Sequence, residues 1–312
     1  MDNVRNAAFS GFLLISFLNG SAQGQTRAPI RYRPYELVNL GLLNGATSSR
    51  ADGLNELGQV VGTCEFPIAW TSSAFCWTQG ALVDLHKSPG GNYSIAHSIN
   101  SVGDTVGEAD DGDIRPKSVL FRSGSVLALG SSGGGNHRAI FLTDSGTAIG
   151  DRAIGFDGPW RGAVWIPRVD KPDRFDETLL PVHPSGDPAA RMGYVLGANQ
   201  AAQAVGYVQS STFGQYGAFW NNNLTHDLTL LTPLEGDWSS YAEGLNDKGV
   251  AVGTSYLGVF GSHAVKWVGP SFTATALPIP ANSAGTRAYD INNAGQIVGV
   301  ALDQAGSPHW IL

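Results

Sequence analysis

AYDINNAGQIVG, at residues 288–299, is the last of six copies of one pattern in this chain. The pattern reads A-x-x-(I/L)-N-x-x-G-x-x-(V/I)-G, and in this copy two short apolar runs flank the connection from Asn292 to Gly295. An Asn side chain can bond the backbone of its own turn, and Gly accepts the positive φ that closes a hairpin. Each copy therefore predicts a β-hairpin.

The spacing of the copies indicates how the hairpins are used. Their closing glycines are separated by 45, 43, 56, 47 and 46 residues, so one insertion interrupts an otherwise regular period. A third apolar run follows each copy and usually ends in Trp, which predicts an aromatic residue that packs between neighbouring units. A fourth short run follows in most repeats. The copies are 51–62, 96–107, 139–150, 195–206, 242–253 and 288–299.

Four short strands per repeat is the content of a β-propeller blade. The sequence therefore predicts an all-β, six-bladed β-propeller, with about 45 residues per blade, in a single domain at residues 35–312. The sixth repeat has no fourth run after Trp310, whereas residues 35–41 resemble the fourth run at 81–85. We expect this N-terminal strand to close the last blade, because pairing the two chain ends removes an exposed sheet edge.

The N-terminus predicts export. Arg5 precedes an apolar run at residues 7–18, and small residues follow up to Ala22, which is typical of a signal peptide at residues 1–22. A buried N-terminal helix is the alternative. Residues 23–34 would then form a short linker, and the protein would be secreted, either extracellular or periplasmic, in an oxidising compartment. Cys64 and Cys76 lie on either side of one predicted hairpin, so they are either a disulfide or two free thiols.

Composition excludes some classes of partner. Gly accounts for 41 of 312 residues, nearly twice the usual share of about 7%, and charged residues make up only 14%, which indicates many turns. The formal net charge is -7 and no basic face is evident, which argues against nucleic acid as a partner. No apolar run reaches the length of about 18 residues that a transmembrane helix requires, so no membrane span is expected after signal cleavage.

The repeats resemble the extracellular HAF-repeat family, whose units read roughly A-x-x-I-N-x-x-G-Q-V-V-G, then A-F-x-W, then a Gly turn and D-L-G. Residues 58–62 (GQVVG), 74–77 (AFCW) and 82–85 (LVDL) match best, and the resemblance covers about residues 35 to 312. Thr143 replaces a turn Asn and Ala202 replaces a turn Gly. The resemblance implies an exported repeat protein and brings no catalytic residues.

The connections that vary between repeats are the predicted functional region. If strands alternate in direction, the N-x-x-G turns lie on one face of the ring and all long connections lie on the other, where recognition usually occurs. Aromatic side chains in these connections could stack on sugar rings, or they could pack the loops against the ring. The candidates are Trp70, Trp160, Trp238, Tyr93, Phe156, Tyr207, Phe213, Tyr216 and Tyr256. The insertion at residues 166–191 is expected to be a solvated connection or a docking arm.

One acidic loop is a weak calcium candidate. It offers carboxylates around Gly112, but it lacks the spacing and the terminal Glu of a calcium loop, so a solvated hairpin tip is the alternative. The carboxylates are Glu108, Asp110, Asp111 and Asp113. No cofactor is predicted.

We therefore expect a binding or surface-interaction module, with a polysaccharide or another cell-surface component as its partner. A propeller hydrolase or lyase with carboxylates at the central channel is the first alternative, although no motif supports an acid/base pair. Its candidate carboxylates are Asp110, Asp151, Asp157, Asp237 and Glu243. A structural cell-envelope protein without a small-molecule ligand is the second alternative, and it would have a flat loop face.

Overall fold

The computed structural model describes residues 37–68, 71–85, 91–110, 112, 116–130, 135–155, 158–184, 192–210, 214–223, 225–258 and 261–311. These residues form antiparallel β-sheets joined by turns and loops, which confirms the all-β prediction. No helix in these ranges is long and apolar enough to cross a membrane. The predicted signal peptide and linker, residues 1–34, lie outside the described residues.

Six sheets follow one another along the chain, and their strands are hydrogen-bonded in sequence order. The first sheet contains β1 (Ser48–Leu54), β2 (Val60–Glu65), β3 (Ser72–Thr78) and β4 (Ala81–Asp84). The second contains β5 (Ser94–Ile99), β6 (Thr105–Ala109), β7 (Lys117–Arg122) and β8 (Ser125–Ala128). The third contains β9 (His137–Leu142), β10 (Ala148–Ala153), β11 (Trp160–Pro167) and β12 (Phe175–Leu179).

The other three sheets repeat this plan. The fourth contains β13 (Gly193–Ala198), β14 (Ala204–Ser210), β15 (Gly214–Trp220) and β16 (Leu228–Leu231). The fifth contains β17 (Ser239–Leu245), β18 (Val250–Tyr256), β19 (Ser262–Val268) and β20 (Thr275–Ala276). The sixth has three strands, β21 (Gly285–Ile291), β22 (Ile297–Leu302) and β23 (Pro308–Ile311).

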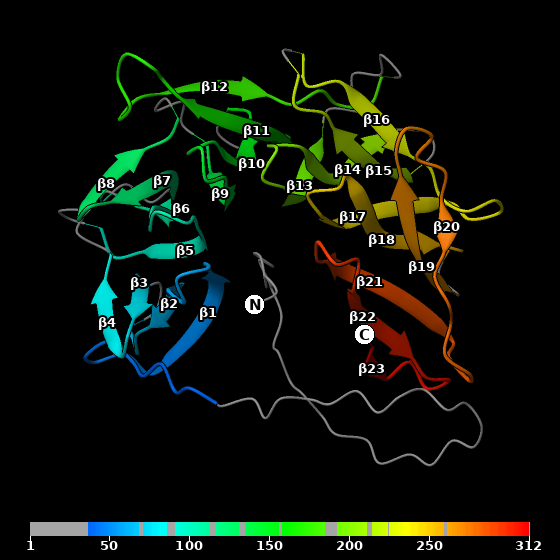
Figure 1. The fold of residues 1–312 in the computed structure, drawn as a ribbon, viewed down its shortest axis with the longest axis horizontal. Helices are drawn as coiled ribbons and strands as arrows, with labels where there is room; N and C mark the ends of the chain where they lie inside the picture. Colours follow the sequence, from blue (N-terminus) through cyan, green and yellow to red (C-terminus); the bar gives the residue numbers. More distant parts are fainter. Residues whose placement is uncertain are drawn as a thin grey trace.

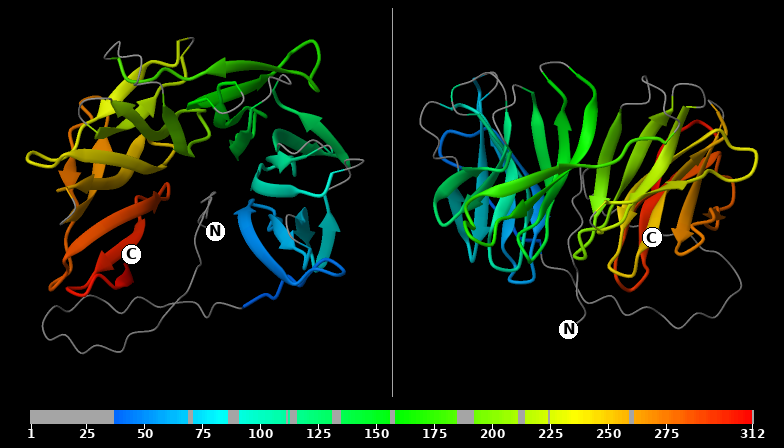
Figure 2. Two further views of the ribbon diagram at one scale, coloured as in Figure 1. Left: turned by 180° about the vertical axis from the view of Figure 1, so that it is seen from behind. Right: turned by 90° about the horizontal axis from the view of Figure 1, so that it is seen from above.

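The sheets stand around a common centre, and the first strand of each sheet lies nearest to it (Figure 1). Strands run across the thickness of this ring, so connections collect on two opposite faces (Figure 2). Because each sheet is antiparallel, the turns between its first and second strands lie on one face, here called the turn face. The connections between second and third strands, and from each sheet to the next, lie on the other, here called the loop face.

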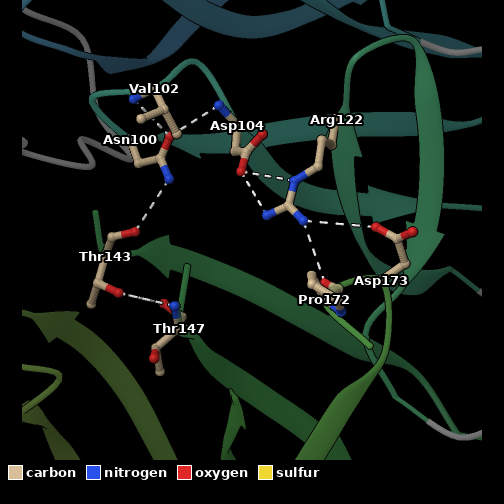
Figure 3. Close-up of polar contacts among 8 residues, drawn as sticks. All are labelled: Asn100, Val102, Asp104, Arg122, Thr143, Thr147, Pro172 and Asp173. Carbon is tan, nitrogen blue, oxygen red and sulfur yellow. Dashed lines mark hydrogen bonds and ion pairs between the residues drawn. The ribbon is translucent and has the colours of Figure 1, made fainter. Parts of the chain in front are cut away.

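One long connection departs from the predicted division. Residues 168–174 join β11 to β12 on the turn face, so the insertion is divided between the two faces. Two contacts dock this connection on the neighbouring sheet (Figure 3): the Arg122 guanidinium donates to the Pro172 carbonyl at 3.4 Å and lies 3.9 Å from the Asp173 carboxylate. The same guanidinium binds Asp104 at 2.7 Å.

The glycine that closes each copy is required by a β-bulge in the first strand. In the fifth sheet, Ala242 pairs with Gly253 and Gly244 pairs with Val252, so Glu243 is the extra residue. A Cβ atom on Gly253 would overlap the Tyr241 carbonyl. All six hairpins carry the same bulge and the same conflict, and bulges commonly re-aim side chains near functional sites.

The Asn of each copy does more than close its own turn. Asn100 Oδ1 accepts the N–H groups of Val102 at 3.2 Å and Asp104 at 2.9 Å, and its Nδ2 donates to the Thr143 carbonyl of the next sheet at 3.3 Å (Figure 3). Equivalent bonds between sheets run from Asn55 to Asn100, from Asn199 to Asn246, and from Asn246 to Asn292. These bonds form a ladder along the turn face.

Three Trp residues of the third strands, Trp165, Trp220 and Trp267, are buried between sheets as predicted, whereas Trp77 is half-buried and Trp310 is 44% exposed. Trp220 is 1% exposed in a cluster with Val164 and Leu180 of the preceding repeat, and its Nε1 donates to the Pro181 carbonyl at 2.8 Å. Trp267 is fully buried and donates in the same way to Thr232 at 2.9 Å. These Trp residues thus attach the third, fourth and fifth sheets each to the one before.

The ring is open between the first and sixth sheets (Figure 1). Leu54 is 39% exposed, whereas the equivalent Ile99 of the second sheet is 1% exposed, because within the described residues no sheet precedes the first one and covers β1. No strand from the described residues pairs with the outer edge of β23.

The predicted closing strand is not seen within the described part of residues 35–41. Residues 37–41 form no strand there, and the Asn39 side chain accepts the Gly41 N–H at 3.0 Å. This contact and the positive φ of Gly41 turn the chain toward the first sheet, where the Gly41 carbonyl accepts the Ser49 hydroxyl at 3.2 Å. The described part of the segment is therefore attached to the first sheet, and residues 35 and 36 lie outside the description.

Candidate functional site

The loop face has an open groove between the fourth and fifth sheets. Its volume is about 590 Å³, and it is lined by the start of β15 and by the connection that leads into β17. Two predicted aromatic candidates, Tyr216 and Trp238, lie on its wall together with polar neighbours. The lining residues are Gly214, Gln215, Tyr216, Gly236, Asp237, Trp238 and Ser239.

Trp238 is exposed although its backbone is fixed. Its side chain is 74% exposed, whereas its N–H donates to the Tyr256 carbonyl at 2.8 Å and so extends the pairing of β17 with β18. Tyr216 is half-buried on β15, and its ring lies 5.6 Å from that of His183. The groove therefore presents one free indole face and one partly buried phenol.

A buried network beneath the groove holds the Trp238 connection in place. Asp237 Oδ2 accepts the Ser255 hydroxyl at 2.5 Å and contacts His263 Nδ1 at 3.0 Å. Ser255 Oγ in turn accepts the Leu234 N–H at 3.0 Å. The Asp237 side chain is only 4% exposed and that of His263 is 31% exposed, and these contacts attach residues 234–238 to β18 and β19. The network thus holds the backbone segment from which the exposed Trp238 side chain projects.

A second group of aromatic side chains crosses the third, fourth and fifth sheets near the first strands. It consists of Trp160, Tyr194, Tyr207, Tyr241 and Tyr256, and we call it the aromatic track. Successive ring centroids are 6.3, 5.0, 4.8 and 5.4 Å apart. These rings contact one another, and cross-strand partners such as Tyr194 and Tyr207 stack directly. Burial raises the pKa of Tyr207 to about 12 and raises that of Tyr241.

Charged pairs occupy the corresponding positions in the first three sheets. Arg50 Nε lies 2.7 Å from Asp52, His97 Nε2 lies 3.1 Å from Glu108, and Arg138 Nη2 lies 2.6 Å from Asp151. Arg287 lies on the sixth sheet, and its guanidinium is 5.6 Å from the centre of the Tyr256 side-chain ring. We call the surface formed by these charged residues and the aromatic track the inner wall. Its charged pairs lie on the first three sheets, and its aromatic track crosses the third, fourth and fifth.

Two of the carboxylates considered for an enzyme, Asp151 and Asp237, make structural contacts within the protein. Asp151 is fully buried, with Oδ1 accepting the Val195 N–H at 2.7 Å and Oδ2 bound to Arg138. Burial outweighs both contacts and raises the pKa of Asp151 to about 6. Asp237 is engaged in the network described above, and burial raises the pKa of Glu243. Asp157 lies outside the described residues.

The structure relocates several aromatic candidates. Trp160, Tyr207, Tyr216 and Tyr256 lie on strands, so the prediction that they belong to loops is wrong, and Tyr93 forms an isolated bridge with Ser72. Among the described candidates, Trp238 and Tyr93 lie on connections between strands. Trp70, Phe156 and Phe213 lie outside the described residues. The groove unites Tyr216 with Trp238, whereas Trp160, Tyr207 and Tyr256 belong to the aromatic track.

The acidic loop has protein partners at both of its described carboxylates. Glu108 binds His97, and Asp110 Oδ1 accepts the N–H groups of Asn92 at 2.9 Å and Tyr93 at 3.3 Å. Asp111 and Asp113 lie outside the description. Within the described residues, no three His, Cys, Asp or Glu side chains are grouped as a metal ion would require.

The two cysteines are free thiols. They lie on adjacent strands, but Cys64 is opposite Ser73 and Cys76 is opposite Val61, an offset of three positions. Three positions along a strand correspond to about 10 Å, beyond the Cα separation of about 7 Å that a disulfide can span. The disulfide alternative is therefore wrong for this register. Burial raises the pKa of both thiols.

Sequence reasoning named several inner-wall residues, such as Tyr207 and Glu243, but missed that they lie together on one wall. Its residues either directly precede the repeat alanine, as Tyr241 does, directly follow the closing glycine, as Tyr207 does, or occupy the bulge, as Glu243 does. An alignment of the six copies would show these positions as variable, with charged or aromatic residues in many copies, beside constant neighbours. That contrast is the signal that could have found them.

No family model matches the sequence, and no curated protein matches it. Two solved structures have similar chains. One is a crystal structure of a puromycin hydrolase mutant in complex with PGG, with 14% identity, a TM-score of 0.49, and coverage of 86% of this chain and 47% of that one. The other is a gluconolactonase from Xanthomonas campestris, with 11% identity, a TM-score of 0.38, and coverage of 85% and 86%. This chain spans about half the length of the hydrolase, and neither similarity is high enough to transfer an activity.

Proposed function

We propose that this protein is an exported carbohydrate-binding module that holds a saccharide chain in the loop-face groove, with a sugar ring stacked on Trp238. The observation that carries the proposal is a Trp side chain 74% exposed in a groove whose backbone is fixed by buried contacts. Large aromatic residues usually bury most of their surface, so an exposed one in a concave site is a candidate for ligand contact. A flat loop face, which a purely structural protein would have, does not fit this groove.

The lining chemistry suits a sugar. An indole offers an apolar face for the C–H side of a pyranose, and neighbouring polar groups can bond its hydroxyls. Gln215 and Ser239 supply such groups beside Tyr216 and Trp238. The groove is open, which suits a segment of a longer polymer. Because the Trp238 backbone is already ordered, little conformational entropy would be lost on binding.

The test is a titration of a panel of neutral and acidic oligosaccharides against the parent and three variants by isothermal calorimetry. Trp238→Ala and Tyr216→Ala should weaken binding at least about tenfold, equivalent to about 1.4 kcal/mol. Trp310→Ala is the matched control, because Trp310 is 44% exposed on the sixth sheet outside the groove. It should bind like the parent. Absence of binding by the parent, or equal loss in all three variants, would refute the proposal.

Three further proposals accompany this function. The six sheets act as the six blades of one propeller, the chain belongs with the HAF-repeat proteins, and residues 1–22 direct export. The ladder of inter-sheet bonds supports the first, and the sequence patterns support the other two. N-terminal sequencing of protein recovered from the culture medium or periplasm tests export. It should begin near Gln23, and an intact Met1 in a cytosolic product would contradict it.

A further inference from the structure

Three arginines occupy the same place in their repeats, directly before the repeat Ala, and only two of them have a carboxylate partner. Arg50 binds Asp52, the bulge residue of its own strand, and Arg138 binds Asp151, its cross-strand partner. The equivalents around Arg287 are Tyr289 at the bulge and Val300 across the strand pair. Neither is a carboxylate, so neither forms an ion pair with the guanidinium.

Arg287 is consequently left with unused donors. No described carboxylate oxygen lies within 4.0 Å of its guanidinium, and its Nε is buried without a hydrogen-bond partner. Its remaining described partner is the Tyr256 ring, 5.6 Å from the guanidinium carbon. Glu243 lies within electrostatic range, where Arg287 partly offsets the increase in its pKa caused by burial. A buried donor without an acceptor is unfavourable, and an anionic ligand that reached it would offset this cost.

Tyr256 connects this arginine with the groove. Its carbonyl accepts the Trp238 N–H at 2.8 Å, and its ring lies beneath the Arg287 guanidinium. Trp238 and Arg287 therefore both contact Tyr256. Trp238 contacts the Tyr256 backbone at the end of β18, and the Arg287 guanidinium lies over the Tyr256 ring. A saccharide on Trp238 that extends toward the ring centre would approach Arg287.

We propose that Arg287 binds the carboxylate of an acidic saccharide, so that the ligand class of the groove is a uronic-acid-containing polysaccharide. This inference rests on the proposed carbohydrate-binding function. A planar guanidinium can offer two parallel N–H donors to a carboxylate, a geometry that a neutral hydroxymethyl group cannot match. The formal net charge of -7 opposes polyanion binding by the protein as a whole, so any preference for the acidic ligand requires a specific cation.

The experiment compares one uronate oligosaccharide with the neutral product of reducing its carboxyl groups to alcohols. The parent should bind the uronate at least about tenfold more tightly, as expected for hydrogen bonds that involve charged groups. Arg287→Gln should bind both ligands equally and about as tightly as the parent binds the neutral one. Arg287→Lys keeps the charge and should retain part of the preference, which separates loss of charge from loss of folding.

The controls distinguish this inference from the function on which it rests. Arg168→Gln removes one positive charge on the turn face and should leave the preference unchanged. Equal binding of both ligands by the parent would overturn the inference while leaving the groove proposal intact. A preference that survives in Arg287→Gln would also overturn it. If neither ligand nor any panel member binds, the carbohydrate-binding function fails, and the inference fails with it.

Discussion

Asn246 and Asn292 form a matched pair that tests whether the inter-sheet ladder stabilises the ring. Each side-chain oxygen accepts two turn N–H groups, at 3.1 and 3.0 Å for Asn246 and at 3.0 and 2.9 Å for Asn292. The amides differ, because Asn246 donates to the Asn292 carbonyl in the next sheet at 3.1 Å, whereas Asn292 donates to Gln296 within its own turn. Substitution by Ala therefore removes the same turn contacts from both but the ladder only from Asn246.

The magnitudes follow from these contacts. Two turn hydrogen bonds contribute about 1 kcal/mol each, so Asn292→Ala should lower the free energy of unfolding by about 2 kcal/mol or less. Asn246 is 4% exposed, and removing its amide takes the inter-sheet donor from the Asn292 carbonyl, which still accepts the Gly295 N–H at 3.0 Å. The lost hydrogen bond adds about 0.5–1.5 kcal/mol, so Asn246→Ala should cost more than Asn292→Ala. Asn246→Asp should also be costly, because it keeps the turn acceptor but sets a carboxylate oxygen against a carbonyl.

Equilibrium urea unfolding, followed by tryptophan fluorescence, measures both effects. Equal slopes in the parent and variants are needed before midpoints are compared. Equal losses in the free energy of unfolding for Asn246→Ala and Asn292→Ala would show that the repeated Asn stabilises its own turn alone. The reasoning about inter-sheet bonds would then be refuted.

Three other results are expected. Trp267→Ala should cost about 3–5 kcal/mol by calorimetry, whereas the 44% exposed Trp310 should cost no more than about half of that; equal costs would contradict the packing scheme. In the native protein, a thiol reagent should modify Cys76 before the buried Cys64, with rates still rising above pH 9 because both pKa values are raised, and a mass decrease of two hydrogens would instead show a disulfide. Burial raises the pKa of Asp290 from 3.8 to about 6, so its stabilising contribution is present below pH 3.8 and lost as the pH rises through 6. Asp290→Asn should therefore stabilise the protein at pH 8 by up to about 3 kcal/mol and have little effect at pH 3.5, and an equal effect at both would contradict this.

The sequence predicted the parts of the fold that depend on local geometry. Asn292 and Gly295 shape a turn whatever surrounds it, and Trp220 recurs where one sheet meets the next. The register of the cysteines could not be predicted as readily, because it depends on where the hairpin connections end. The turn at Asn39 was also missed, since an Asn-x-Gly sequence can form either a turn or the end of a strand.

The candidate site was predicted only in part, for a physical reason. Trp238 was found because an aromatic residue outside the repeat position needs its own explanation. Arg287 and Tyr256 lie on different sheets, so the distance between them cannot be predicted from the sequence of any single repeat. The missing partner of Arg287 becomes visible only when its repeat equivalents, Arg50 and Arg138, are compared in space.

The most direct test of the account is a crystal structure of the protein with the tightest-binding oligosaccharide of the panel. The account predicts a sugar ring stacked on the Trp238 indole in the groove between the fourth and fifth sheets, with an adjacent carboxylate directed toward Arg287. Electron density for the ligand at another face of the ring, with the groove free, would contradict it.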